Sequence, residues 1–192
     1  MKTKYLMIIG VLLLVADQAS KIVIKLTMTI GENIPVLGDW FNIHFVENAG
    51  AAWGMELGGE WGKLALSLFR VAASIALFIW IYRLQKRGAP KGVLIALVMV
   101  LVGAIGNVVD SAFYGLIFSE STPYQVATLV PWGEGYSTFM HAKVVDMLYF
   151  PIIETENFTF FNAIFNLADS YITIAAFYLI LFQRKFFNDK KA

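Results

Sequence analysis

The sequence contains no cysteine and only two histidines, His44 and His141. The absence of cysteine excludes disulfides, thiolate metal sites and cysteine nucleophiles. Two imidazoles cannot form a three-histidine metal site, so a catalytic metal would have to be held mainly by carboxylates. We therefore expect neither a metal nor another cofactor, and the usual nucleophile and base pairs are poorly supplied.

Charged residues are also scarce, at 15% of the 192 residues, whereas 58% are hydrophobic. The mean hydropathy is +0.66. So small a charged fraction is untypical of a soluble domain, and the same composition excludes disorder. Basic residues stand in small groups at the ends of apolar runs, and no basic tract is long enough to predict nucleic-acid binding. The composition predicts an integral membrane protein.

The apolar residues form four blocks, each long enough to cross a membrane. A hydrocarbon core about 30 Å thick requires about 20 apolar helical residues. The blocks are Tyr5–Ile24, Leu64–Tyr82, Gly92–Val109 and Phe160–Phe182. We predict an all-α membrane protein with four transmembrane helices, in which residues 1–192 form a single domain.

The basic residues predict the orientation, because cytoplasmic loops are rich in Lys and Arg. They precede the first block, fill the second connection and follow the fourth block: Lys2, Lys4, Arg83, Lys86, Arg87, Lys91, Arg184, Lys185, Lys190 and Lys191. Both termini are therefore predicted to be cytoplasmic. The long connections 25–63 and 110–159 then face the outside.

The first outer connection contains a predicted β element. Phe41, Ile43 and Phe45 alternate with intervening residues, a period of two that indicates a half-buried strand. We expect this strand and an amphipathic segment to lie on the outer membrane face.

Polar and ionisable residues also occur within or beside the apolar blocks, where they are costly and usually mark function. They are Asp17 with Lys21, Asn48, Arg70, Asn107 with Asp110, Asp146, and Asn166 with Asp169. Most stand at the predicted outer ends of the blocks. This distribution predicts one polar site at the outer membrane surface.

Two acids in apolar settings, Asp146 and Asp169, suggest a mechanism. Two carboxylates close enough to share a proton can act as base and acid on a peptide bond. Asn166 shares a helix face with Asp169 because it stands three residues earlier. Either acid taken alone could equally be a surface acid or a partner of a Lys or Arg, with no catalytic role.

Two other classes remain open on the residues alone. A small transporter or proton-coupled carrier would use Asp17, Lys21 and Asp169 as relay groups, but it predicts polar residues through the bilayer midplane. A non-catalytic membrane scaffold leaves the acids in apolar stretches unexplained.

Five motifs in order resemble a known family. They are Asp17-Gln18-Ala19-Ser20-Lys21, Asn48-Ala49-Gly50-Ala51-Ala52-Trp53, Gly106-Asn107-Val108-Val109-Asp110, Val144-Val145-Asp146, and Phe165-Asn166-Leu167-Ala168-Asp169-Ser170. Together they resemble bacterial signal peptidase II, the lipoprotein signal peptidase family of integral-membrane aspartyl proteases. The resemblance covers nearly the whole chain.

The resemblance implies a catalytic dyad of Asp146 and Asp169 without a metal. It further implies positions that shape or support the site: Asp17, Lys21, Asn48, Gly50, Asn107, Asp110, Asn166 and Ala168.

The resemblance also implies a substrate and a location. The family cleaves diacylglyceryl-modified prolipoproteins just before the lipidated cysteine, at the periplasmic or outer face of the bacterial cytoplasmic (inner) membrane. Membrane lipid and the inhibitor globomycin are then expected partners.

The chain departs from the family pattern in two places. Ser111 follows Asp110 where the family usually has arginine, and Arg70 is a candidate replacement for that charge. Alternatively, Arg70 extends to the interface or pairs with an acid. The second departure is an insertion containing Ser119–Phe139, which makes Asp110 an alternative to Asp146 as the first catalytic acid. The motif ending in Asp146 favours Asp146.

Overall fold

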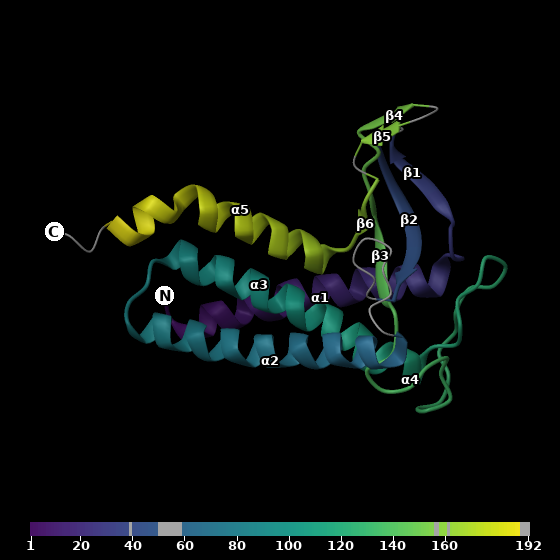
Figure 1. Cartoon of the computed structure of the whole chain (residues 1–192), viewed down its shortest axis with the longest axis horizontal. Helices are drawn as coiled ribbons and strands as arrows, with labels where there is room; N and C mark the ends of the chain where they lie inside the picture. Colours follow the sequence, from purple (N-terminus) through teal and green to yellow (C-terminus); the bar gives the residue numbers. More distant parts are fainter. Residues whose placement is uncertain (39, 50–58, 156–157, 161, 189–192) are drawn as a thin grey trace.

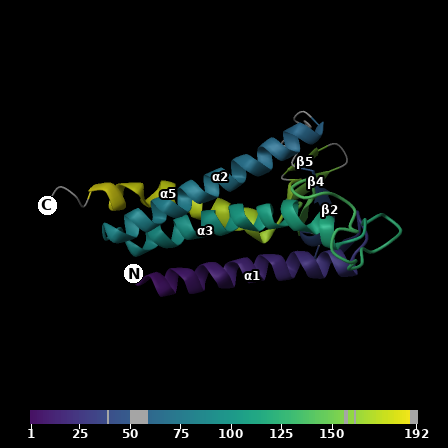
Figure 2. The same ribbon diagram turned by 90° about the horizontal axis from the view of Figure 1, so that it is seen from below.

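A computed structural model of the chain describes residues 1–38, 40–49, 59–155, 158–160 and 162–188. Its helices lie side by side along one axis (Figures 1 and 2). They are α1 (Thr3–Thr27), α2 (Gly59–Lys86), α3 (Lys91–Val109), the π-helical turn η1 (Asp110–Tyr114), α4 (Gly115–Ile117) and α5 (Leu167–Asn188). The central helix, α3, contacts α1, α2 and α5.

An antiparallel sheet lies at one end of the helices, away from the N terminus and the last turns of α5 (Figure 1). Its strand order is β1-β2-β3-β6. These strands are β1 (Asn33–Leu37), β2 (Phe41–Asn48), β3 (Val144–Tyr149) and β6 (Ile164–Phe165), while β4 (Ile153–Thr155) and β5 (Phe158–Phe160) form a separate pair.

Two apolar cores hold these parts together. The first fills the helix bundle and consists of Leu6, Ile81, Leu94, Leu97, Val98, Leu101 and Val102. The second joins the sheet to the end of α1 and to η1, and consists of Met28, Phe45, Tyr114, Phe118, Ala142, Val145 and Met147. Because Val145 and Met147 flank Asp146, the second core fixes the strand on which this acid lies.

Three of the four predicted spans are confirmed as apolar helices long enough to cross a membrane. Within the described ranges these are Thr3–Thr27, Leu64–Lys86 and Lys91–Ile117. The third helix continues through η1 into α4 and ends at Ile117. The predicted start of the second outer connection, residue 110, is therefore too early.

The predicted start of the fourth span, Phe160, is wrong. Ile164 and Phe165 pair with Tyr149 and Leu148 as strand β6, and α5 begins only at Leu167. The apolar part of α5, Leu167–Phe182, is therefore shorter than the other three helices. Aromatic and β-branched residues raise hydropathy equally in strands and helices, so an apolar run does not distinguish them. The fold is mostly helical with a small antiparallel sheet, which confirms the predicted helical membrane fold with a β element.

The strand predicted around Phe41–Phe45 is confirmed as β2, but its alternation is not. Asn42 and Phe45 are buried, whereas Phe41 and Ile43 are half-buried. The β2–β3 register shifts between Ile43 and Val46. Such a bulge rotates the side chains that follow it, so a strict period of two cannot hold.

The predicted insertion folds against α4. Its backbone amides at Val130, Gly133 and Ser137 donate to the carbonyls of Ile117, Leu116 and Gly115, at 3.0, 3.0 and 2.9 Å. Residues 140–143 then connect the insertion to β3.

Close packing of α3 against α5 depends on Gly103. A Cβ atom there would lie 2.4 Å from the carbonyl oxygen of Ala168 and 2.6 Å from Ile172 Cγ1. We expect Gly103→Ala to destabilise the protein by about 1–3 kcal/mol, because a backbone oxygen cannot move aside without shifting α5. Thermal unfolding in detergent measures this effect.

Gly10→Ala is the matched control. A Cβ at Gly10 would meet Val98 and Val102 at 3.5 and 3.6 Å, which is ordinary contact. Since Ala has a higher helix propensity than Gly, the thermal midpoint of Gly10→Ala should stay the same or rise. Equal losses in the two variants would contradict the proposed role of Gly103 packing.

Candidate active site

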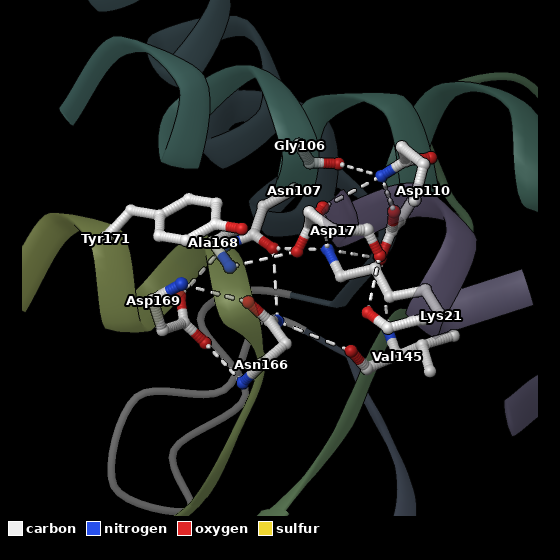
Figure 3. A network of polar contacts seen from close by, with 12 residues as sticks. Asp17, Lys21, Gly106, Asn107, Asp110, Val145, Asn166, Ala168, Asp169 and Tyr171 are labelled. Carbon is white, nitrogen blue, oxygen red and sulfur yellow. Dashed lines mark hydrogen bonds and ion pairs between the residues drawn. The ribbon is translucent and has the colours of Figure 1, made fainter. Parts of the chain in front are cut away.

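Polar side chains from α1, α3, η1 and the start of α5 meet a side chain of strand β3 where the bundle contacts the sheet. The helix-borne members point toward one another in Figure 3. The set comprises Asp17 and Lys21 of α1, Asn107 of α3, Asp110 of η1, Asp146 of β3, Asn166 just before α5, and Ala168 and Asp169 in its first turn. The structure thus brings together residues far apart in the sequence.

The ammonium group of Lys21 lies at the centre of this network. Its Nζ is 3.2 Å from Asp17 Oδ2, 2.9 Å from Asp110 Oδ2 and 2.9 Å from Asn107 Oδ1. Lys21, Asp17 and Asp110 are completely buried. A buried charge is tolerated only when its partners replace water, and these three contacts do so. The i,i+4 ion pair of Asp17 with Lys21 is thus part of a larger network.

The first turn of α5 is held by side-chain caps. Asn166 Oδ1 accepts a hydrogen bond from the backbone N of Asp169 at 2.9 Å, and Asp169 Oδ2 accepts one from the backbone N of Asn166 at 3.4 Å. Asp17 Oδ1 accepts from the backbone N of Ala168 at 2.9 Å. This reciprocal capping box explains why the helix begins at Leu167. It also places carboxylates where the helix dipole favours negative charge.

Two asparagine side chains link the acids. Asn166 Nδ2 donates to Asp146 Oδ1 at 2.7 Å, and Asn107 Nδ2 donates to Asp169 Oδ1 at 2.9 Å. Asn166 Nδ2 also lies 3.2 Å from Asn107 Oδ1. On the opposite side, Asn48 Nδ2 at the end of β2 donates to Asp146 Oδ2 at 3.2 Å.

The environment of Asp146 shifts its acidity. Burial raises its pKa from 3.8 to about 7, and the negative charge of Asp169 adds to this rise. The amides of Asn48 and Asn166 and the charge of Lys21 act in the opposite direction. Near neutral pH the pair of acids can therefore hold one proton, which is the state required for combined acid and base chemistry.

Asp110 has a different position from Asp146. Its Oδ2 accepts the backbone N–H of Val145 at 3.1 Å, in addition to its contact with Lys21. Its Oδ1 accepts from Gln18 Nε2 at 3.0 Å. Both oxygens of Asp110 are thus engaged, and one of them holds the strand residue immediately before Asp146.

Gln18 is a site residue that sequence reasoning missed. Its Nε2 lies 3.0 Å from Asp17 Oδ2, 3.0 Å from Asp110 Oδ1 and 3.2 Å from the carbonyl of Gly106. Its Oε1 accepts from the hydroxyl of Tyr114 at 3.2 Å. The signal was available, because Gln18 is an amide inside an apolar helix and adjoins Asp17.

Comparisons with known proteins agree with this arrangement. The family model described as signal peptidase (SPase) II matches residues 9–185. The chain belongs to the signal peptidase II family. The resemblance stated from the motifs is therefore confirmed.

Individual relatives cover most of the chain. A lipoprotein signal peptidase from Porphyromonas gingivalis is 45% identical over 183 residues, which span 89% of this chain and 79% of the relative. One from Fusobacterium nucleatum is 31% identical over 94% of this chain and 86% of the relative. A solved structure described as a bacterial membrane enzyme shares the fold, with a TM-score of 0.63, 24% identity, and coverage of 99% of this chain and 94% of that one. Membership in a peptidase family does not favour the transporter or scaffold alternatives.

Within this signal peptidase II chain, Arg70 lies beside the residue that replaces the family arginine. Arg70 and Ser111 line the same small cavity. The guanidinium of Arg70 interacts electrostatically with the carboxylates of Asp169, Asp146 and Asp110. This placement is compatible with Arg70 supplying the missing charge, which remains a prediction.

Two predicted site positions, Gly50 and Ala168, and the two histidines remain to be placed. Gly50 lies outside the described residues. Ala168 is completely buried against the helix junction, and its backbone amide contacts Asp17. The histidines are not part of the site, since His44 packs edge-to-face against Tyr149 and His141 contacts Thr138. Within the described ranges, no group of three or more His, Asp or Glu residues is placed to hold a metal ion.

Removing the positive charge at the centre of the network should destabilise the fold. Lys21→Met leaves the carboxylates of Asp17 and Asp110 buried without a counterion, and we expect a loss of about 3–5 kcal/mol in unfolding free energy. The thermal midpoint in detergent reports the change. Lys4→Met, an exposed substitution on the same helix, is the control and should leave the midpoint unchanged. Equal midpoints for both variants would show that Lys21 is not a required counterion.

Proposed function

We propose that this protein is a membrane aspartyl endopeptidase that removes the signal peptide from diacylglyceryl-modified prolipoproteins and cuts before the lipidated cysteine. Family membership and the names of the relatives support the activity. The observation that carries the proposal is the bridge formed by Asn166, which contacts Asp146 through its side chain and Asp169 through both side chain and backbone. A strand acid and a helix acid are thereby held at one place.

In the mechanism that we propose, the dyad begins with one proton, assigned to Asp146. Asp169 accepts a proton from water while the water oxygen attacks the scissile carbonyl carbon. Asp146 then donates its proton to the departing nitrogen as the C–N bond breaks. Neither a metal nor a covalent intermediate is required. The burial of Asp146 supports its assignment as the initial acid, because burial favours the neutral carboxyl.

We further propose that α5 crosses the membrane together with α1, α2 and α3, so that residues 1–192 form one membrane domain. The termini are then cytoplasmic, and the sheet and the dyad lie at the outer face of the bacterial inner membrane. The basic residues at the ends of the apolar blocks support this orientation. The sequence from Asn48 to Trp61 is rich in Gly and Trp and predicts a segment that closes over the site, but most of this segment lies outside the described residues.

A groove between α2 and α3 is suited to the lipid chains of the substrate. Its volume is about 330 Å³, and its lining is apolar apart from one serine: Val71, Ser74, Ile75, Phe78, Leu101, Ile105 and Val108. The Ser74 hydroxyl is already satisfied by the carbonyl of Arg70 at 2.7 Å. Since Arg70 directly precedes Val71, the groove begins close to the acids. Acyl chains in this groove would place the lipidated cysteine near the dyad.

Replacing either dyad acid tests the function. We expect Asp146→Asn and Asp169→Asn each to lower kcat by about 10²–10⁴-fold, the usual contribution of a general acid or base. The measurement is cleavage of a diacylglyceryl-modified prolipoprotein by the purified protein in detergent. Wild-type activity should resist a metal chelator and be blocked by globomycin.

The key comparison is with Asp110→Asn. If Asp110→Asn were inactive while Asp146→Asn retained full activity, the assignment of Asp146 would be wrong. A folded wild-type protein that fails to cleave would contradict the function itself.

The pH profile tests the proton assignment. Because the pKa of Asp146 is raised to about 7, the singly protonated dyad is present below that pH and is lost as the pH rises through it. We expect kcat to fall on the alkaline side near pH 7. In Asn48→Ala the ionised carboxylate loses a donor, so the pKa and the alkaline limb should move upward. If the alkaline limb of Asn48→Ala stayed at the same pH or moved to lower pH, the assignment of the proton to Asp146 would be wrong.

The raised pKa of Asp146 also predicts how the free energy of unfolding changes with pH, which can be measured without substrate. The folded protein binds the Asp146 proton more tightly than the unfolded chain does. Its contribution to stability is complete below about pH 4 and is lost as the pH rises through about 7. This contribution should be absent from the pH dependence of unfolding in Asp146→Asn.

A further inference from the structure

A second buried ammonium lies one helical turn beyond Lys21. Lys25, in the last turn of α1, is completely buried. Its Nζ forms an ion pair with Glu47 of β2 and is 2.9 Å from Ser121 Oγ in the insertion. Ser121 Oγ also lies 3.2 Å from Glu47 Oε1, so the three groups contact one another.

The insertion contributes a second contact to this ammonium. The ring of Tyr136 lies 4.7 Å from Lys25 Nζ, within the range of a cation–π interaction. The Tyr136 hydroxyl accepts the backbone N–H of Lys143 at 3.0 Å, and Lys143 Nζ is 3.5 Å from Glu47 Oε2. We refer to Lys25, Glu47, Ser121, Tyr136 and Lys143 as the Lys25 cluster.

The Lys25 cluster is joined to the candidate active site by the strands. Glu47 directly precedes Asn48, the residue that donates to Asp146. Glu47 also pairs in the sheet with Val145, whose amide is bound by Asp110. Displacement of Glu47 would therefore move the Asn48 amide relative to the Asp146 carboxylate.

We propose that the Lys25 cluster is a positioning device through which the insertion at Ser119–Phe139 holds Asn48 against Asp146. This role rests on the proposed function of the dyad. Ser121 and Tyr136 tie the insertion to α1, β2 and the residue before β3. They are positioning residues, because neither contacts the acids directly.

The first variant to measure is Ser121→Ala, with Ser119→Ala as the matched control. The Ser119 hydroxyl contacts Thr128 within the insertion, away from Lys25. We expect Ser121→Ala to lower kcat by roughly threefold with little change in KM, since small misplacements of a catalytic group reduce the chemical step. The alkaline limb of the pH profile should move upward, as in Asn48→Ala. Ser119→Ala should match wild type in all three measurements.

The double variant Asn48→Ala/Ser121→Ala isolates the coupling. If Ser121 acts through Asn48, adding Ser121→Ala to Asn48→Ala should not move the limb further. Fully additive shifts would overturn the proposal. So would a Ser121→Ala enzyme with a lower thermal midpoint but a wild-type pH profile and kcat, because that outcome assigns Ser121 a purely structural role.

Removing the ion pair provides an independent test. Glu47→Gln alone leaves a buried ammonium unpaired, so the variant to compare is Lys25→Met/Glu47→Leu, which removes both charges. We expect this protein to fold, with lower kcat and an upward-shifted limb. An alkaline limb at the same pH as in the wild type would overturn the positioning role. Failure of the underlying dyad assignment is recognised separately, because Asp146→Asn would then retain activity in the same assay, whereas failure of the function itself would leave the wild type inactive.

Discussion

The burial of the Lys21 ammonium is the constraint on which the rest of the structure depends. Its charge is stable inside the protein only because Asp17, Asp110 and Asn107 surround it at hydrogen-bonding distances. Two of these partners also bind other parts of the structure. Asp17 caps α5, and Asp110 holds the backbone of β3. One buried cation thus fixes the relative positions of two helix ends, one helix start and one strand.

The two candidate acids are supported in different ways, and the difference suits a pair with unequal roles. Asp169 belongs to a capping box, so the interaction that begins α5 also positions its carboxylate. Asp146 is placed by strand pairing and by the apolar residues beside it. Asn166 contacts both acids and connects the helical and sheet parts of the site. Local helix capping and long-range sheet pairing therefore meet at one amide side chain.

Part of the fold and site was predictable because the signals were local. Length and hydropathy identified three membrane helices, and isolated polar residues in apolar stretches identified Asp17, Lys21 and Asn107. The start of α5 was mispredicted because Ile164 and Phe165 are as apolar in a strand as in a helix. Gln18 was overlooked although it adjoins Asp17, because its contacts with Asp110 and Tyr114 are made across the tertiary structure. The bulge in β2 has no signal in the alternation of its side chains.

The sequence by itself determined the membrane character, the three long helices and the family, because these depend on composition, segment length and motif order. Only the tertiary structure decided which polar residues share contacts. Hydrogen bonds between α1, η1, β3 and α5 join residues far apart in the sequence, such as Asp17 and Ala168, which are 151 positions apart. Such pairings leave no periodic trace in a single sequence. They arise because buried charges must find partners when apolar helices and strands pack together.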